Sequence, residues 1–141
     1  MRDINKLIIH CSYTKPGMDI GVEEIDAWHR KKGWNGCGYH YVIRRDGTVE
    51  TGRSTRLVGA HCLGHNEGSV GICLAGGMSD DEKPERNFTE EQYKSLRHAI
   101  GALRNGLGDL DLFGHYELDS NKECPCFDVN EWYEGEDDGV F

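Results

Sequence analysis

The clearest pattern of hydrophobic and polar positions lies between residues 87 and 108 and predicts an amphipathic helix. Thr89 and Gln92 have the spacing of a capping box, in which each side chain accepts a hydrogen bond from the other residue's backbone N–H. The apolar residues that follow recur every three or four positions and share one helix face: Tyr93, Leu96, Ile100, Leu103 and Leu107. We expect this face to pack against a core.

Two further segments have helical patterns. In residues 19–34, Val22, Ile25 and Trp28 recur at three-residue steps, and Gly33 supplies a signal for the end of the helix. Residues 128–134 predict a short closing helix.

Five segments read as strands. The apolar residues that precede His10 predict a buried strand, and residues 69–77 predict a central one. Residues 39–43 and 48–52 predict a hairpin around the turn Asp46–Gly47. Residues 110–117 predict a last strand that ends at His115. Strands interleaved with covering helices indicate an α/β fold, a single domain with a central mixed β-sheet flanked by helices.

Length and composition agree with one domain. The chain has 141 residues, of which 37% are hydrophobic and 29% are charged. A chain of this length can bury a hydrophobic core without support from disulfides or structural metal ions. We expect a folded domain over residues 1–133 and an acidic tail over residues 134–141. No run approaches the ~20 apolar residues that span a membrane, and the N-terminal apolar stretch is too short for a signal peptide.

Charge and cysteine usage exclude some classes of function. The net charge of -9 argues against binding to nucleic acid, which attracts basic surfaces. Without an export signal, we expect the six cysteines to be mostly reduced thiols, several of them in the core. Cys124 and Cys126 flank Pro125, which is not the C-x-x-C spacing of a redox helix or zinc ribbon.

Histidines at predicted strand ends are candidate metal ligands. His10 and His115 each stand where a predicted strand ends, and sites in α/β proteins assemble at such ends. Cys124 follows His115 closely, and two imidazoles with one thiolate suit a catalytic zinc with an open fourth position. Spacing alone leaves the alternative that these residues are unconnected. His29 and His98 fall on helices among polar neighbours, so we expect them to be solvated.

Four sequence blocks occur in a characteristic order: IIHCSYTKP, GYHYVIRRDGTVETGR, GAHCLGHNEGSVGICLAGG, and GHYEL followed by KECPCFD. Together they resemble the zinc-dependent N-acetylmuramoyl-L-alanine amidases, the family of the T-odd coliphage lysozyme and of animal peptidoglycan recognition proteins. The resemblance runs from about Lys6 to Trp132 and is strongest to the phage lysozymes. It implies that residues 1–133 are a catalytic amidase domain.

The resemblance implies one catalytic zinc ion. Its ligands are expected to be His10, His115 and Cys124. The segment from His115 to Cys124 is one residue longer than in similar members, and Cys126 stands where the family usually has serine or glycine. Cys126 could therefore compete for the metal or oxidise with Cys124.

The resemblance also implies catalytic and substrate-binding residues. Tyr39 is expected to orient the attacking water or exchange a proton with it, and His40 would face the opposite side of the strand. Lys122 is expected to stabilise the oxyanion, although Asn121 or Glu123 takes its place if the extra residue lies elsewhere.

His61 and Asn66 match positions that line the peptidoglycan groove, with purely structural roles as the alternative. The alternation that separates Tyr39 from His40 also separates His10 from Cys11, so we expect Cys11 to be an ordinary buried thiol.

The function implied is hydrolysis of the amide between N-acetylmuramic acid and the L-alanine of the stem peptide. We expect a monomeric phage or prophage endolysin, made in the cytoplasm without a signal peptide and delivered to the cell wall by a separate pore protein. The alternatives are a non-catalytic peptidoglycan-binding module, whose members typically lack the cysteine ligand, and a cytoplasmic amidase that recycles anhydro-muropeptides. A regulatory contact with RNA polymerase, as in the coliphage lysozyme, has no support in this sequence.

Overall fold

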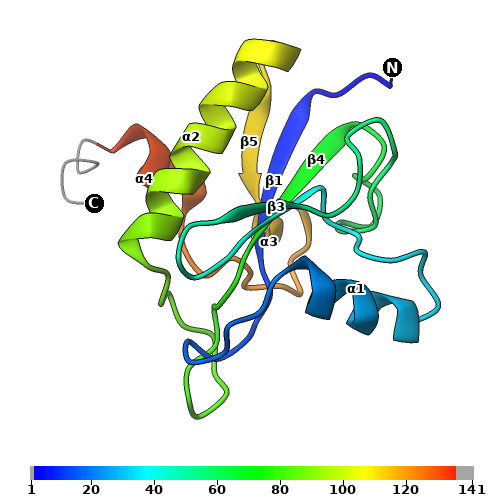
Figure 1. Ribbon diagram of the computed structural model, residues 1–141. Coiled ribbons are helices and arrows are strands. Elements are labelled where there is room, and N and C mark those ends of the chain that lie inside the picture. Colours follow the sequence, from blue (N-terminus) through cyan, green and yellow to red (C-terminus); the bar gives the residue numbers. More distant parts are fainter. Residues whose placement is uncertain (1, 136–141) are drawn as a thin grey trace.

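A five-stranded mixed sheet organises the computed structural model, which describes residues 2–135 (Figure 1). The strands are β1 (Lys6–Cys11), β2 (Tyr41–Ile43), β3 (Val49–Thr51), β4 (Ser69–Leu74) and β5 (Asp111–Gly114). They lie in the order β3-β2-β4-β1-β5. Only the hairpin partners β2 and β3 run antiparallel, and the other neighbours are parallel. The predicted fold class is confirmed.

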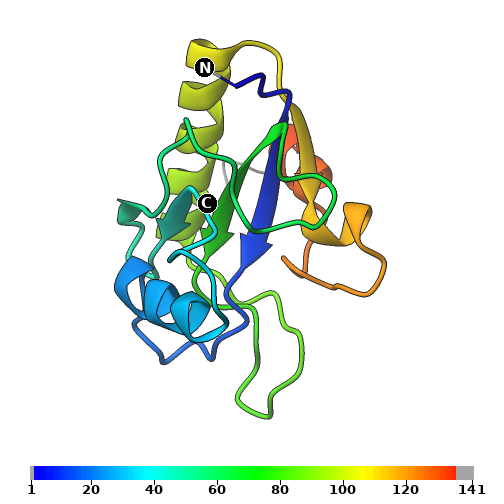
Figure 2. The same ribbon diagram turned by 90° about the vertical axis from the view of Figure 1, so that its right-hand side faces the viewer.

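Helix α2 (Glu90–Leu107) covers one face of the sheet. Thr89 Oγ1 accepts from the backbone N–H of Gln92 at 3.1 Å, and Gln92 Oε1 accepts from that of Thr89 at 3.0 Å, so the predicted capping box is present. The predicted apolar stripe faces Leu7, Ile9 and Ile72 of the sheet. Figure 2 shows α2 along one side of the sheet and α3 at the edge formed by β5.

Helix α1 (Val22–Lys31) packs on the other face, away from α2 (Figure 1). Ile25 is buried, but the predicted inward position of Trp28 is wrong, because its exposed fraction is 38%. His29 is buried instead, so its predicted solvation is also wrong. Position 29 lies only ~40° around the helix from position 25, and His29 Nδ1 accepts from the N–H of Gly38 at 2.8 Å. His98 is exposed, as predicted.

Four predicted strands, over residues 39–43, 48–52, 69–77 and 110–117, are longer than the observed ones. Tyr39 and His40 precede β2, although their carbonyls still accept hydrogen bonds from the N–H groups of Arg53 and Gly52. His115 begins the short helix α3 (His115–Leu118) rather than ending β5. At this junction the Glu117 side chain accepts from the N–H of Gly114, the last residue of β5, at 3.0 Å.

The closing helix α4 (Val129–Glu134) begins at Asp128, whose side chain accepts from the N–H of Glu131 at 3.0 Å. Trp132 is buried against the α2 side of the core, so the predicted closing helix is confirmed. Most of the predicted acidic tail, residues 136–141, lies outside the described residues. Within residues 2–135, no helix combines the length and hydrophobicity needed to cross a bilayer.

Candidate metal centre

The register of β1 and β5 brings two histidines together at the ends of adjacent parallel strands. Ile9 pairs with Gly114, so the residues that follow them, His10 and His115, lie side by side. Their Nδ1 atoms are 3.1 Å apart and their ring centroids 4.4 Å apart. The sheet topology thus brings two imidazole nitrogens close together, although the two histidines are 105 residues apart in sequence.

Cys124 completes the cluster from the loop after α3. Its Sγ and the two imidazole nitrogens all lie within 4.8 Å of one another. Zinc binds imidazole nitrogen at about 2.0–2.1 Å and thiolate at about 2.3 Å, which puts tetrahedral ligand atoms roughly 3.3–3.6 Å apart. The cluster therefore has the donor types that suit zinc, and its donor atoms lie close enough together to hold one metal ion. In residues 2–135 it is the only such group of histidine, cysteine or acidic side chains.

The backbone of β1 supports the thiol. The N–H of Cys11 donates to Cys124 Sγ at 2.9 Å, and the Cys124 thiol donates in return to the carbonyl of Cys11 at 3.7 Å. Cys126 lies outside the cluster, and its thiol donates to the carbonyl of Gly77 at 3.5 Å. All six cysteines are free thiols and four are buried, as predicted. Cys11 is one of the four, but its thiol hydrogen-bonds those of Cys124 and Cys126, so it is not separated from the site as the strand alternation predicted.

The two imidazoles are held neutral. His10 has an exposed fraction of 1%, and burial, reinforced by His61 and His115, lowers its pKa well below the ordinary value. Burial also lowers the pKa of His115, with Lys122 acting in the same direction and Asp119 against it. A neutral imidazole keeps a lone pair for a metal at neutral pH, so both side chains are suited to ligation.

Tyr39 lies beside the cluster, with its ring centroid 5.0 Å from that of His10. Burial, followed by the nearby thiols, raises the pKa of its phenol well above the ordinary value. The phenol is therefore protonated at neutral pH and can donate a hydrogen bond. His40 points elsewhere and is fully buried, where its Nδ1 accepts from the N–H of Gly71 at 3.0 Å.

Two hollows flank the cluster. One, of about 470 Å³, is lined by Tyr39, Lys122 and Cys124, and the other, of about 520 Å³, by Tyr39, Lys122 and Asn66. His115 lines both. Asn121 and Glu123, the alternatives to Lys122, line only the first of the two.

Two residues that line the hollows were not predicted from the sequence. Lys32 lines both and Trp34 lines the second, and Lys32 Nζ lies 5.1 Å from the centroid of the Trp34 ring. Both follow α1, where no periodic pattern marks them. Two lysines, Lys32 and Lys122, therefore bring positive charge to a chain of net charge -9.

The remaining predicted site residues are held by internal hydrogen bonds. Asn66 Oδ1 accepts from the N–H groups of His61 and Cys62 at 2.9 and 2.8 Å. His61 is buried, and its Nδ1 lies 2.8 Å from His10 Nε2. Both side chains also line the second hollow. The contact between His61 and His10 was not predicted, and no local pattern signals it.

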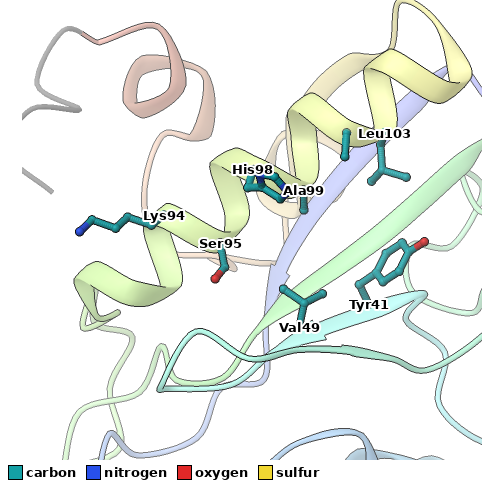
Figure 3. A pocket seen from close by; sticks show the side chains of 8 residues that line it. Tyr41, Val49, Lys94, Ser95, His98, Ala99 and Leu103 are labelled. Atoms are coloured by element: carbon teal, nitrogen blue, oxygen red, sulfur yellow. The ribbon is translucent and has the colours of Figure 1, made fainter.

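A larger cavity, of about 570 Å³, lies between α2 and the β2–β3 hairpin (Figure 3). Its walls include Tyr41, Val49, Ala99 and Leu103. Figure 3 shows these side chains, with His98 on the facing helix, and none of them belongs to the metal cluster. This cavity is therefore separate from the candidate site.

Comparison with known proteins identifies the family. A family model described as N-acetylmuramoyl-L-alanine amidase matches residues 1–127, and the chain belongs to this family. The chain is 44% identical to the endolysin of Klebsiella phage KP32 over 94% of its length and 87% of that protein's. It is also 44% identical to the endolysin of Escherichia phage T7, over 91% and 84%.

The fold has solved counterparts. An endolysin N-acetylmuramoyl-L-alanine amidase, LysCS from Clostridium intestinale URNW, matches with a TM-score of 0.77 and 31% identity, over 88% of this chain and 76% of that one. The predictions of family, fold class and N-acetylmuramoyl-L-alanine amidase activity are confirmed by these matches. The roles of individual site residues and the domain boundary at residue 133 stay predictions.

Proposed function

We propose that the chain is a zinc-dependent endolysin that cleaves the amide between N-acetylmuramic acid and the L-alanine of the stem peptide. One observation carries the zinc assignment: the donor atoms of His10, His115 and Cys124 converge between two open hollows. Three protein ligands are the usual complement of a catalytic zinc, whereas a structural zinc takes four. Cys126, the nearby candidate for a fourth, donates to Gly77 instead.

When bound, zinc would polarise the scissile carbonyl and lower the pKa of a bound water to ~7. The protein's own part begins with its ligands. Burial keeps His10 and His115 neutral, and the N–H of Cys11 holds Cys124 Sγ in position. These features prepare the ligands before the metal arrives.

Tyr39 and Lys122 supply the remaining catalytic groups in this proposal. The protonated phenol of Tyr39 stands beside His10, where it can orient the attacking water and exchange a proton with it. Lys122 lines both hollows, so its ammonium group can stabilise the oxyanion that forms at the scissile carbonyl. One well-placed donor of this kind is worth ~3 kcal/mol. His61 and Asn66 form part of the wall that binds the muramoyl peptide.

In this proposal the enzyme is a monomer that acts on intact cell wall, which it reaches through a separate pore protein in the membrane. The test uses mass spectrometry of products from purified sacculi and from soluble anhydro-muropeptide, each with and without a chelator. We expect stem peptides with a free L-alanine amine from sacculi, and no product with chelator. Activity on the soluble substrate alone would instead indicate a recycling amidase.

The metal assignment has its own test. We expect His10→Ala to lose both bound zinc, measured by elemental analysis, and release of stem peptide. His98→Ala is the matched control, because His98 is an exposed histidine on α2 outside the cluster. Full wall hydrolysis by His10→Ala would refute the assignment.

A further inference from the structure

Behind the metal cluster, a buried chain of hydrogen bonds leads from His10 into the protein. His10 Nε2 lies 2.8 Å from His61 Nδ1, and His61 Nε2 lies 3.2 Å from Ser69 Oγ. Ser69 Oγ in turn donates to the carbonyl of His65 at 2.7 Å. His10, His61 and Ser69 have exposed fractions of 1%, 8% and 0%, so bulk water does not compete for these hydrogen bonds.

The proton positions follow from the far end of the chain. A carbonyl only accepts, and a serine hydroxyl has one proton. Ser69 gives that proton to the carbonyl of His65, so its oxygen must accept from His61 Nε2–H. A buried imidazole among other imidazoles is neutral and carries one N–H, which leaves His61 Nδ1 as an acceptor. His10 Nε2 must therefore donate.

We infer that His61 is a positioning residue that holds His10 in the Nε2–H tautomer, with the lone pair of Nδ1 directed at the metal position. Nδ1 is the atom that lies 3.1 Å from His115 Nδ1. The inference rests on the proposed zinc function and deepens it, because it gives His61 a role toward the metal besides the groove role predicted from sequence. Partners of this kind fix the ring orientation of a metal ligand and raise its basicity.

The fold holds the His61 ring in place for this role. Gly71 of β4 leaves the space that the ring occupies, since a Cβ at residue 71 would lie 2.6 Å from His61 Cγ. Gly59 does the same on another side, where a Cβ would lie 2.7 Å from His61 Cδ2. Asn66 Oδ1 holds the backbone N–H of His61 at 2.9 Å. Two glycines thus leave room for the ring, and Asn66 anchors the backbone that carries it.

The first test measures the tautomer directly in the zinc-free wild-type protein. Nitrogen-15 NMR distinguishes a protonated ring nitrogen from one with a free lone pair. We expect protons on Nε2 of both His10 and His61, and none on their Nδ1 atoms. A proton on His10 Nδ1 would overturn the inference, and this measurement needs no variant to fold and no zinc to bind.

The second test measures zinc affinity by competition with a chromophoric chelator. We expect His61→Phe, which keeps a ring but removes both nitrogens, to bind zinc roughly 10- to 100-fold more weakly. We expect His61→Gln to lose less, because its amide oxygen can accept the proton of His10 Nε2. The control is His98→Phe, since His98 is an exposed histidine on α2 outside the cluster, whereas the His40 ring packs against that of His61 with centroids 5.8 Å apart.

The outcomes separate this inference from the proposed function. A His61→Phe variant that folds, judged by thermal unfolding of the zinc-free protein, and binds zinc within twofold of wild type would overturn the inference alone. An equal loss in His98→Phe would also overturn it, because the loss would then not depend on His61. A wild-type protein that binds no zinc would contradict the proposed function, while the NMR result would still decide the tautomer.

Discussion

Substitution of Lys122 by alanine tests the assignment of the catalytic lysine. The side chain is exposed and lines both hollows beside the metal cluster, so its removal leaves no cavity in the core. Two unit charges 4 Å apart interact by about 1 kcal/mol in water and about 4 kcal/mol near a protein surface. Substrate in the hollows displaces part of the water, so we take about 2–3 kcal/mol for the ammonium–oxyanion interaction.

That free energy corresponds to a fall in kcat of roughly 30- to 150-fold. The assay is release of L-alanine-terminated stem peptide from sacculi at saturating substrate, with zinc content and thermal midpoint measured on the same samples. We expect both of these to stay at wild-type values, because Lys122 is not a ligand. Lys94→Ala, which removes an exposed lysine from α2, is the control.

The alternatives to Lys122 are tested in parallel. Asn121→Ala and Glu123→Gln are expected to hydrolyse the wall at close to the wild-type rate, because each side chain lines only one of the two hollows. A wild-type rate for Lys122→Ala would remove its catalytic role. A larger loss in either neighbour would mean that the extra residue between His115 and Cys124 shifts the alignment.

Three further predictions concern the site and its surroundings. Tyr39→Phe keeps the ring beside His10 and should retain zinc but lose about 10²- to 10⁴-fold in kcat, the usual range for a proton-transfer group; an unchanged kcat would exclude that role. Cys124→Ser should abolish the rise in thermal midpoint that zinc gives the wild type by mass action, and a retained rise would contradict ligation by Cys124. Burial lowers the pKa of His40 to about 4 from 6.5, so the unfolded chain binds more protons between these values. The free energy of unfolding should therefore fall as pH drops from 6.5 towards 4, by up to about 1.4 kcal/mol per pH unit from this histidine. The check is chemical denaturation of zinc-free wild type and His40→Gln at several pH values. The same change of unfolding free energy with pH in both proteins would contradict this prediction.

Local pattern was sufficient where the stabilising interactions are themselves local. The capping box of Thr89 and Gln92 and the apolar stripe of α2 are set by neighbours within one or two turns, and both occur as predicted. On α1, the apolar character of Trp28 led to the prediction that its side chain faces the core. In the structure His29 is buried instead and hydrogen-bonds the N–H of Gly38 across a loop, a contact that periodicity does not record.

The candidate metal site, in contrast, depends on contacts between residues far apart in sequence. The types His, His and Cys suggested zinc, but only the parallel register of β1 and β5 brings His10 beside His115. The same holds for His61, which is 51 residues from His10 and whose direction is set by a slot that Gly59 and Gly71 leave open. A motif can therefore indicate which residues bind a metal. Which nitrogen of each ring has the lone pair depends on hydrogen bonds that exist only after the sheet has formed.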